Sequence, residues 1–381
     1  MEFRIDRRDL AEAVAWAGRV LPARTPVPVL GGLLLEATAG RLTVSGFDFE
    51  TAARIETGAE TATDGQVLVL GRRLLDICRV LPDGPVSCGL EGTRFTVEAG
   101  GTRFGLSTLP REEYPPLPVP PEPYGSVDAA AFATAVGQVA VAAGRDDTLP
   151  ALTGVQLRLD GDTMTLSSSD RYRYAVRRLG WKPEAVASGG TAEALLSARR
   201  LLDVARSLAR TGRVRIGLAP SGGGLIGFEG GGMRTAVRLL DGRLPGYGSL
   251  FAMAGAAVAE VECGALAEAV RRVAVVAEAN SPVRLDFAAG GSVLLRAGYG
   301  DDVAAQQLPA GLHGAAEMSV AFNPVYLLDA LASFESPRVR MELLGPGQRA
   351  LLTGVTAEGS AAAEGPEADH RHLLMSVKQL V

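Results

Sequence analysis

The chain has 381 residues, of which 47% are hydrophobic and 21% are charged, and its formal net charge is −5. This length exceeds one ordinary hydrophobic core and indicates two or three domains of a globular protein. The acidic balance argues against a conventional basic nucleic-acid-binding domain, although net charge says nothing about how charge is distributed.

Membrane insertion, export and a disulfide framework are all disfavoured by the sequence. No apolar run reaches the roughly 20 residues that a membrane span requires. The charged beginning, MEFRIDRRDL, lacks the apolar core of a secretion signal. The cysteines Cys78, Cys88 and Cys263 form no CxxC pair, and an odd count without metal-ligand spacing is typical of a reducing compartment. We therefore expect a cytoplasmic protein that needs no metal and no other cofactor.

Taken in chain order, the sequence repeats one succession of elements: helix, strands, second helix, strands. The first helices are predicted where LAEAVAWAGRV, FATAVGQVAVA and LAEAVRRVAVV begin, at Leu10, Phe132 and Leu266. Alternating apolar residues, as in RLTVSGFDF (41–49) and SVLLRAG (292–298), predict the strands. The second helices are RRLLDICRVL (72–81), RRLLDVARSL (199–208) and VYLLDALASF (325–334). Repetition at a fixed interval indicates one structural unit written three times.

Two segments rich in proline or glycine separate these repeats. They are YPPLPVPPEPYG (114–125), which is typical of a stiff spacer, and LPGYGSLFAMAGAA (244–257). We predict an α+β fold of three domains, 1–121, 122–254 and 255–381, each with two helices on one side of an antiparallel sheet.

The repeated second helix has an apolar face and a polar face. Apolar residues at i, i+3, i+4 and i+7 form a stripe for packing on a sheet. They are Leu74, Ile77, Cys78 and Leu81, then Leu201, Val204, Ala205 and Leu208, then Leu327, Ala330, Leu331 and Phe334. The polar face carries arginines in the first two copies but Val325, Asp329 and Ala332 in the third. It is either an ordinary exposed surface with weak ion pairs or a set of arginines presented to one anionic partner.

Six segments are distinctive when they are taken together in chain order. They are ICRVLP (77–82), RFGLSTLPREEYPPL (103–117), SSSDRYRYAV (167–176), RLLDGRLPGY (238–247), AFNPVYLLDAL (321–331) and HLLMSVKQL (372–380). In this order they resemble the bacterial DNA polymerase III β subunit, the replicative sliding clamp. The resemblance implies three tandem DNA-clamp domains, of which two copies form a head-to-tail homodimeric ring around double-stranded DNA. It also implies partners: the DNA polymerase III α subunit, the clamp loader and other proteins with a clamp-binding motif. A closed ring retains DNA without tight phosphate binding, so the acidic net charge no longer argues against DNA.

The same resemblance assigns residues to three surfaces. The DNA-facing residues that it implies are Arg24, Arg72, Arg73, Arg79, Arg199, Arg200 and Arg206. The dimer interface would join an edge strand holding Phe104 and Leu106 to the third domain near Val275. A pocket between the second and third domains would take a short partner peptide, with walls formed by Leu152, Ser169, Arg173, Tyr174, Pro245, Leu250, Leu373, Met375 and Val377. Otherwise, the arginines are ordinary surface residues and the interface residues belong to the core.

Two segments of this pocket depart from the family pattern. Tyr174 stands where a leucine is usual, and its hydroxyl needs a partner if it is buried. Ser376 replaces a proline, which removes a constraint on φ, and the chain continues through Gln379, Leu380 and Val381. A second-copy clamp with an altered pocket, resistant to a clamp-targeting inhibitor, is therefore one alternative function. A ring-shaped interaction scaffold outside replication is another.

An enzyme is the remaining class, and the sequence does not favour it. His313, His370 and His372 form no HExxH motif, and we expect surface or rim positions for them. The Gly-rich SGGGLIGFEGGGMR (221–234) lacks the GK[ST] ending of a phosphate-binding loop and predicts a hairpin. Acidic pairs at 146–147 and 301–302 have no nearby ligand set for a cation. Cys78 lies on an apolar stripe, and no catalytic constellation can be assembled, so we expect a non-catalytic protein.

Overall fold

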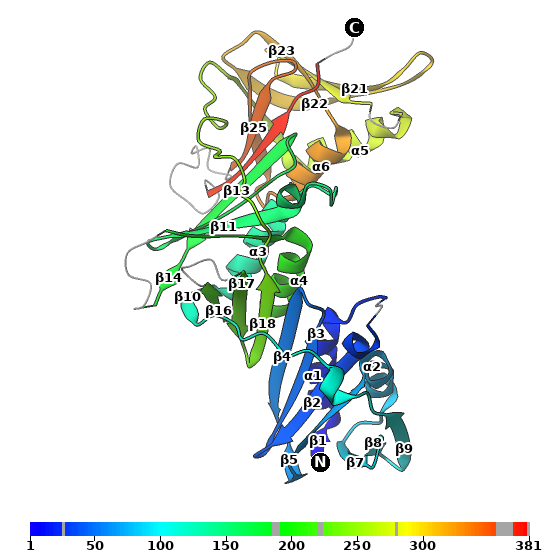
Figure 1. The fold of residues 1–381 in the computed structure, drawn as a ribbon. Helices are drawn as coiled ribbons and strands as arrows, with labels where there is room; N and C mark the ends of the chain where they lie inside the picture. The colour runs from blue at the N-terminus through cyan, green and yellow to red at the C-terminus, as the bar shows by residue number, and fades with distance from the viewer. Residues whose placement is uncertain (25–26, 185–190, 219–223, 279–280, 356–368, 379–381) are drawn as a thin grey trace. The chain divides into compact units, whose positions relative to one another are not determined.

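The structure is a computed structural model that describes residues 1–24, 27–184, 191–218, 224–278, 281–355 and 369–378 (Figure 1). Its residues form two compact units: Met1–Ala129 with Arg210–Arg238, and Ala130–Ala209 with Leu239–Val381. Across these described ranges, no helix is both long enough and apolar enough to cross a membrane.

The first unit combines two helices with two antiparallel sheets. The helices are α1 (Arg7–Ala17), which Asp6 caps by accepting a hydrogen bond from the Arg8 N–H at 2.8 Å, and α2 (Gly71–Val80). One sheet has the order β5-β1-β7-β8-β9, and the other contains β10-β16-β17-β18-β4-β3-β2-β6. Their bounds are β1 (Glu2–Asp6), β2 (Gly32–Thr38), β3 (Arg41–Phe47), β4 (Thr51–Gly58), β5 (Glu60–Thr63), β6 (Gly65–Leu70), β7 (Pro85–Glu91), β8 (Arg94–Ala99), β9 (Thr102–Ser107), β10 (Pro123–Asp128), β16 (Arg213–Leu218), β17 (Leu225–Gly230) and β18 (Met233–Arg238).

A continuous sheet joins the first repeat to strands of the second. β18 pairs antiparallel with β4, with Met233 opposite Ile55 and Val237 opposite Thr51. The Gly-rich segment predicted as a hairpin forms paired strands β17 and β18, which confirms that prediction; its residues 221–223 lie outside the described part. Because backbone hydrogen bonds continue across this junction, strands of the middle repeat belong to the first compact unit.

The second unit holds the other helices and one long sheet. The helices are α3 (Ala129–Ala140, whose first residue ends the first unit), α4 (Ala198–Leu208), α5 (Cys263–Val273) and α6 (Pro324–Ala332). The sheet has the order β15-β11-β12-β13-β26-β25-β24-β19-β22-β21-β20-β23. Its strands are β11 (Gly154–Asp160), β12 (Thr163–Ser169), β13 (Arg173–Gly180), β15 (Ala192–Ser197), β19 (Ala257–Glu262), β20 (Val283–Ala288), β21 (Ser292–Tyr299), β22 (Asp302–His313), β23 (Glu317–Phe322), β24 (Arg338–Leu343), β25 (Arg349–Val355) and β26 (His370–Met375).

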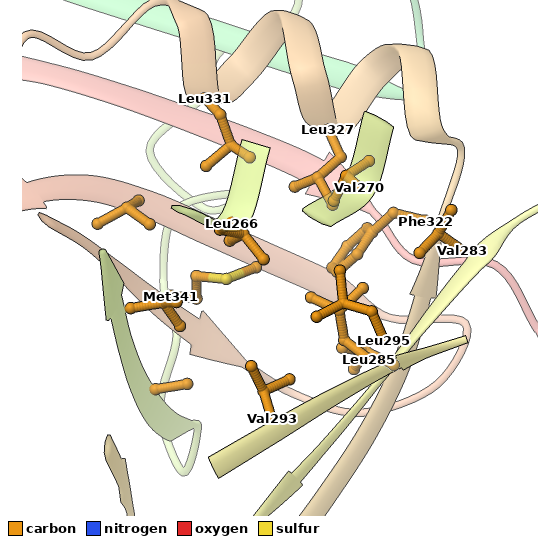
Figure 2. Packing of buried hydrophobic residues seen from close by; sticks show 14 of the residues in the cluster. Leu266, Val270, Val283, Leu285, Val293, Leu295, Phe322, Leu327, Leu331 and Met341 are labelled. Carbon is orange, nitrogen blue, oxygen red and sulfur yellow. The ribbon is translucent and has the colours of Figure 1, made fainter. Parts of the chain in front are cut away.

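Packing in this unit joins the second repeat to the third. β13 pairs antiparallel with β26, so Arg173 lies opposite Leu374 and Arg177 opposite His370. Helices α5 and α6 cover the sheet of the third repeat through a buried apolar core (Figure 2). Figure 2 labels Leu266 and Val270 of α5, Leu327 and Leu331 of α6, and Val283, Leu285, Val293, Leu295, Phe322 and Met341 of the strands and their ends.

The apolar stripes predicted for the repeated second helix are confirmed in all copies. Buried residues are Leu74, Ile77 and Cys78 on α2, Leu201, Val204, Ala205 and Leu208 on α4, and Leu327, Ala330 and Leu331 on α6. Leu81 directly after α2 is also buried, and Phe334 after α6 packs partly buried against the core. The helical spacing of the apolar residues agrees with their burial because a helix that packs on a sheet buries only one face.

Candidate functional site

The residues predicted for the peptide pocket gather in the second unit around β13 and β26. Tyr174 lies opposite Leu373 in the register of these strands. Both belong to one hydrophobic cluster, against which Leu152 and Leu250 pack partly buried. Beyond Leu373, the side chains of Met375 and Val377 are exposed, at 36% and 38%. The other predicted members are Ser169 and Arg173 at the β12–β13 turn and Pro245 in the segment after β18.

A tight turn from Ser169 to Arg173 shapes one side of this site. The Asp170 carboxylate accepts hydrogen bonds from the N–H groups of Tyr172 and Arg173, both at 3.1 Å. The Ser169 hydroxyl donates to the Arg173 carbonyl at 2.8 Å. Arg171 at the tip has a φ of +80°, a left-handed conformation that costs energy for a residue with a Cβ. The turn is therefore fixed by side chains and carries local strain.

Arg173 is held in ion pairs rather than presented to solvent. Its side chain is 4% exposed; Nε donates to Asp170 at 2.8 Å and Nη1 to Asp329 of α6 at 2.7 Å. The guanidinium also lies over the Tyr326 ring, 4.4 Å from its centroid, and Tyr326 stacks on Tyr172 at 6.1 Å. Burying a cation requires such partners, so Arg173 fastens the second repeat to α6 of the third.

Tyr174 is buried in a cluster of three aromatic rings that all contact one another. Its ring centroid is 5.9 Å from that of Tyr247 and 5.9 Å from that of Phe251, which it meets edge to face. The hydroxyl donates to the Pro245 carbonyl at 2.9 Å, which supplies the partner that burial requires. Burial raises the pKa of the Tyr174 hydroxyl, which therefore stays protonated and remains a donor.

The segment from Leu244 to Met253, which carries Tyr247 and Phe251, is tied down on two further sides. The Leu244 N–H donates to the Gln156 side-chain oxygen at 2.8 Å. Arg349 of β25 donates to the carbonyls of Ser249 and Leu250, both at 2.9 Å. The proline- and glycine-containing segment predicted as a linker therefore packs as one wall of the site.

Ser376 fastens the chain after β26 in a way that proline does not permit. Its N–H donates to the Gln348 carbonyl at 2.8 Å, a bond for which proline has no hydrogen. Its hydroxyl accepts from the Gln348 N–H at 2.9 Å and lies 2.9 Å from the Gly345 carbonyl oxygen. This bonding holds Met375 and Val377 in place. The predicted extension, Gln379, Leu380 and Val381, lies outside the described residues.

The surface or rim positions predicted for His370 and His372 are wrong. They are 2% and 0% exposed on the face of β26 that also carries Leu374, since residues two apart on a strand share a side. His370 Nε2 lies 2.8 Å from the Ser333 hydroxyl, whereas neither His372 nitrogen has a hydrogen-bond partner among the described residues. Burial lowers the pKa of His370 to about 4 and that of His372 well below its usual value. Both imidazoles are therefore neutral at pH 7. Unlike these two residues, His313 is exposed, as predicted.

All of the predicted DNA-facing arginines except Arg24 lie on helices, and these helices belong to both units. Arg72, Arg73 and Arg79 are exposed on α2, while Arg24 is exposed in the segment before residue 27. Arg72 donates to the Pro22 carbonyl at 3.0 Å and so ties this segment to α2. On α4, Arg199 and Arg206 are exposed and Arg200 is half-buried. On α6, Val325 is exposed, and Asp329 is the residue that pairs with Arg173.

The residues predicted for the dimer interface are not ordinary core residues. Phe104 and Leu106 are half-buried on β9, which is an edge strand among the described strands of its sheet. They line a groove of about 590 Å³ against α2, together with Arg73 and the exposed Leu70 and Val80. In the second unit, Val275 follows α5 in a short 3-10 helix, Ala274–Val276, and is 82% exposed.

Several residues of the site escaped the sequence prediction. The sequence predicts a linker for the segment that holds Tyr247 and Phe251, although two aromatic residues in a proline- and glycine-containing segment are a signal of packing. It predicts Asp329 as a polar-face residue, and nothing local indicates its bond to Arg173. Within the described ranges, His, Cys, Asp and Glu side chains form no group of three or more that is arranged to hold a metal ion.

Three family descriptions match the chain in order. They are the N-terminal domain of the DNA polymerase III beta subunit at residues 1–118, its central domain at 126–246 and its C-terminal domain at 249–366. The chain belongs to the DNA polymerase III β subunit family. The predicted α+β fold of three tandem clamp domains, and the resemblance read from six short segments, are thereby confirmed.

Individual relatives match this chain over nearly its full length. The chain is 49% identical to the beta sliding clamp of Streptomyces coelicolor over 381 residues, covering 99% of both chains. It is 41% identical to the beta sliding clamp homolog GriR of Streptomyces muensis, again with 99% of both chains covered. The crystal structure of the DNA polymerase III β subunit of Pseudomonas aeruginosa matches 100% of both chains with a TM-score of 0.89 at 25% identity. A griselimycin-bound sliding clamp from the same organism shows the same fold, with a TM-score of 0.89 at 24% identity.

Proposed function

We propose that the chain is a sliding clamp: two copies close head to tail into a ring around duplex DNA and tether a replicative polymerase to it. The observation that carries this proposal is the ordered match of all three family domains, together with 49% identity to a sliding clamp over 99% of both chains. On this proposal the chain has no catalytic activity of its own and works in the cytoplasm, with domains at 1–121, 122–254 and 255–381.

The proposed DNA-facing surface consists of the arginine faces of the repeated helices. Arg72, Arg79, Arg199 and Arg206 are exposed and come from the first two copies, whereas α6 contributes none. A small number of arginines facing the DNA suits a ring that must slide. Each neutralised phosphate adds salt-dependent affinity, and tight binding would impede sliding. Replacing Arg199 and Arg206 by alanine should lower the salt dependence of binding to short linear duplexes by roughly 0.9 per lost phosphate contact. Arg41, which is exposed on a strand and paired with Glu56, is the control.

The proposed dimer interface joins the groove at Phe104 and Leu106 to the surface around Val275 of the partner subunit. An edge strand with unpaired backbone groups and exposed apolar neighbours favours pairing with another chain. Leu106→Asp should shift the chain from dimer to monomer in analytical ultracentrifugation. Val119→Asp, at a side chain that is 86% exposed, is the matched control. A dimer unaffected by Leu106→Asp contradicts this placement.

Retention on circular DNA tests the ring itself. The full-length chain is loaded by a clamp loader onto nicked circular DNA, and the bound fraction is measured before and after linearisation. A ring stays on the circle and slides off the free ends, whereas a conventional DNA-binding protein remains bound to both forms. A scaffold outside replication is retained on neither.

A second candidate is a clamp whose altered pocket resists a clamp-targeting compound. The burial of Tyr174 and the bonding of Ser376 favour it, because both residues depart from the family pattern within one pocket. Dissociation constants for griselimycin and for a polymerase III α subunit peptide, compared with those of the Streptomyces coelicolor clamp, test it. Equal values for both proteins would exclude this role.

A further inference from the structure

The apolar side chains at the centre of the partner pocket are already covered by the chain itself. Tyr174 and Leu373 are 3% exposed, and Phe251 is 9% exposed. Apolar contacts stabilise a complex by removing surface from water, and these side chains have almost none left to offer. An apolar side chain of a partner must therefore displace one of these buried side chains before it can contact the others.

Tyr174 is one of three aromatic rings that pack against one another at the centre of the proposed pocket. Its ring packs against both Tyr247 and Phe251, whose own centroids are 5.3 Å apart, and its hydroxyl reaches the Pro245 carbonyl at 2.9 Å. A leucine at this position has neither the ring nor the hydroxyl, so it leaves the space open and cannot bond to Pro245. Gln156 and Arg349 bond to the segment from Leu244 to Met253 from outside the ring cluster. Tyr174 bonds to the same segment from within the cluster.

The exposed apolar residues lie at the rim of the pocket. Tyr172 is 59% exposed, and its carbonyl accepts a hydrogen bond from the Met375 N–H at 2.8 Å, which places these two residues side by side. Met375 and Val377 are also exposed, whereas Tyr174 is buried. A partner therefore meets the rim first.

We propose that Tyr174 is a built-in occupant of the partner pocket, which a partner peptide must displace by separating the Tyr174 hydroxyl from Pro245. The inference rests on the proposed function, because it assumes that partners bind at this pocket. Its consequence is selectivity: only peptides whose apolar anchor compensates for the lost ring contacts and hydrogen bond bind tightly. Peptides that rely on rim contacts alone bind weakly.

Affinity measurements on matched variants test this role. Isothermal titration of a synthetic peptide carrying the clamp-binding segment of a polymerase III α subunit, and of griselimycin, is performed on the full-length wild type, Tyr174→Phe, Tyr174→Leu and Tyr114→Phe. Tyr174→Phe should bind about fivefold more tightly, the factor for one hydrogen bond that need not be broken. Tyr174→Leu should bind the peptide about 30-fold more tightly, because binding then breaks neither the hydrogen bond nor the contacts between the aromatic rings. Tyr114, a buried tyrosine of the first unit, is the control and should match the wild type.

Unchanged or weaker affinity in both Tyr174 variants overturns the proposal, and Tyr174→Phe keeps it testable if Tyr174→Leu does not fold. A crystal structure of the wild-type peptide complex gives an independent answer. Separation of the Tyr174 hydroxyl from Pro245 supports displacement, whereas a bound peptide with this hydrogen bond intact refutes it. Retention on circular DNA is measured in parallel for all variants. Loss of retention in the wild type counts against the ring, while the order of affinities still decides the role of Tyr174.

Discussion

Removing the Asp329 carboxylate should cost far more stability than removing that of Asp76, although both occupy the same position of the repeated helix. Asp329 pairs with Arg173 at 2.7 Å, and the two side chains are 32% and 4% exposed. Asp76 pairs with Arg79 at 3.0 Å, and those side chains are 63% and 73% exposed. The same residue in the same helical phrase therefore makes a largely buried ion pair in one copy and a solvated one in the other.

The magnitude follows from these environments. A hydrogen bond to a buried charged group contributes about 1.5–3 kcal/mol. Water reaches a third of Asp329, and Asp170 remains as a partner for Arg173, so the value should lie in the lower half of this range. We expect Asp329→Asn to lower the free energy of unfolding by about 2 kcal/mol, and Asp76→Asn by less than about 0.5 kcal/mol.

Urea unfolding provides the assay. Fluorescence of Trp181 in a Trp16→Phe background follows the second unit, and Trp16 in a Trp181→Phe background follows the first, because the two tryptophans lie in different units. A double-mutant cycle of Asp329→Asn with Arg173→Met should give a coupling energy of about 2 kcal/mol. Equal costs for the two aspartate variants, or a coupling near zero, would refute the assignment of this ion pair.

Further predictions concern the buried histidines, the strained turn and the tail. Since the folded state holds the pKa of His370 at about 4, below its ordinary 6.5, the unfolded chain binds the proton first. His370 alone should thus lower the free energy of unfolding by about 3 kcal/mol as pH drops from 7 to 4, and His370→Gln should remove that part of the slope in urea titrations. His372→Leu should raise the thermal midpoint, gaining about 1–2 kcal/mol by removing two nitrogens that have no hydrogen-bond partner within the described part of the chain. Arg171→Gly should gain about 0.5–1 kcal/mol in the same melts by relieving its positive φ. Ser376→Pro should speed hydrogen exchange of the 348 amide, because its hydroxyl acceptor is lost; unchanged exchange would contradict that bond.

Predictions from local pattern succeeded where the physical cause is local. The spacing of Leu201, Val204 and Leu208 identified the buried face of α4, because a helix brings residues three and four apart to one side. The need of the Tyr174 hydroxyl for a partner also followed from residue type alone. The identity of that partner did not, since Pro245 lies 71 positions along the chain.

Predictions failed or stopped where packing of distant segments decides the outcome. The sequence predicts surface or rim positions for the histidines of β26, yet this strand lies between β13 and β25, with the Phe334 ring 4.7 Å from that of His370. The resemblance implies a pocket-wall position for Arg173, but it gives no sign that the guanidinium bonds to Asp329, 156 positions away. Nothing in the sequence near Arg173 distinguishes an exposed arginine from one neutralised in this way.

The sequence by itself determined the repeat, the helical faces and the family, because these depend on residue type and on spacing within one element. Tertiary structure alone decided how the third copy uses its aspartate, why both histidines are neutral and which carbonyl the Tyr174 hydroxyl bonds. Each of these depends on burial, which is set when strands and helices from distant parts of the chain meet. The contribution of a charge or a hydroxyl to the free energy of folding becomes large only when water has been removed from around it.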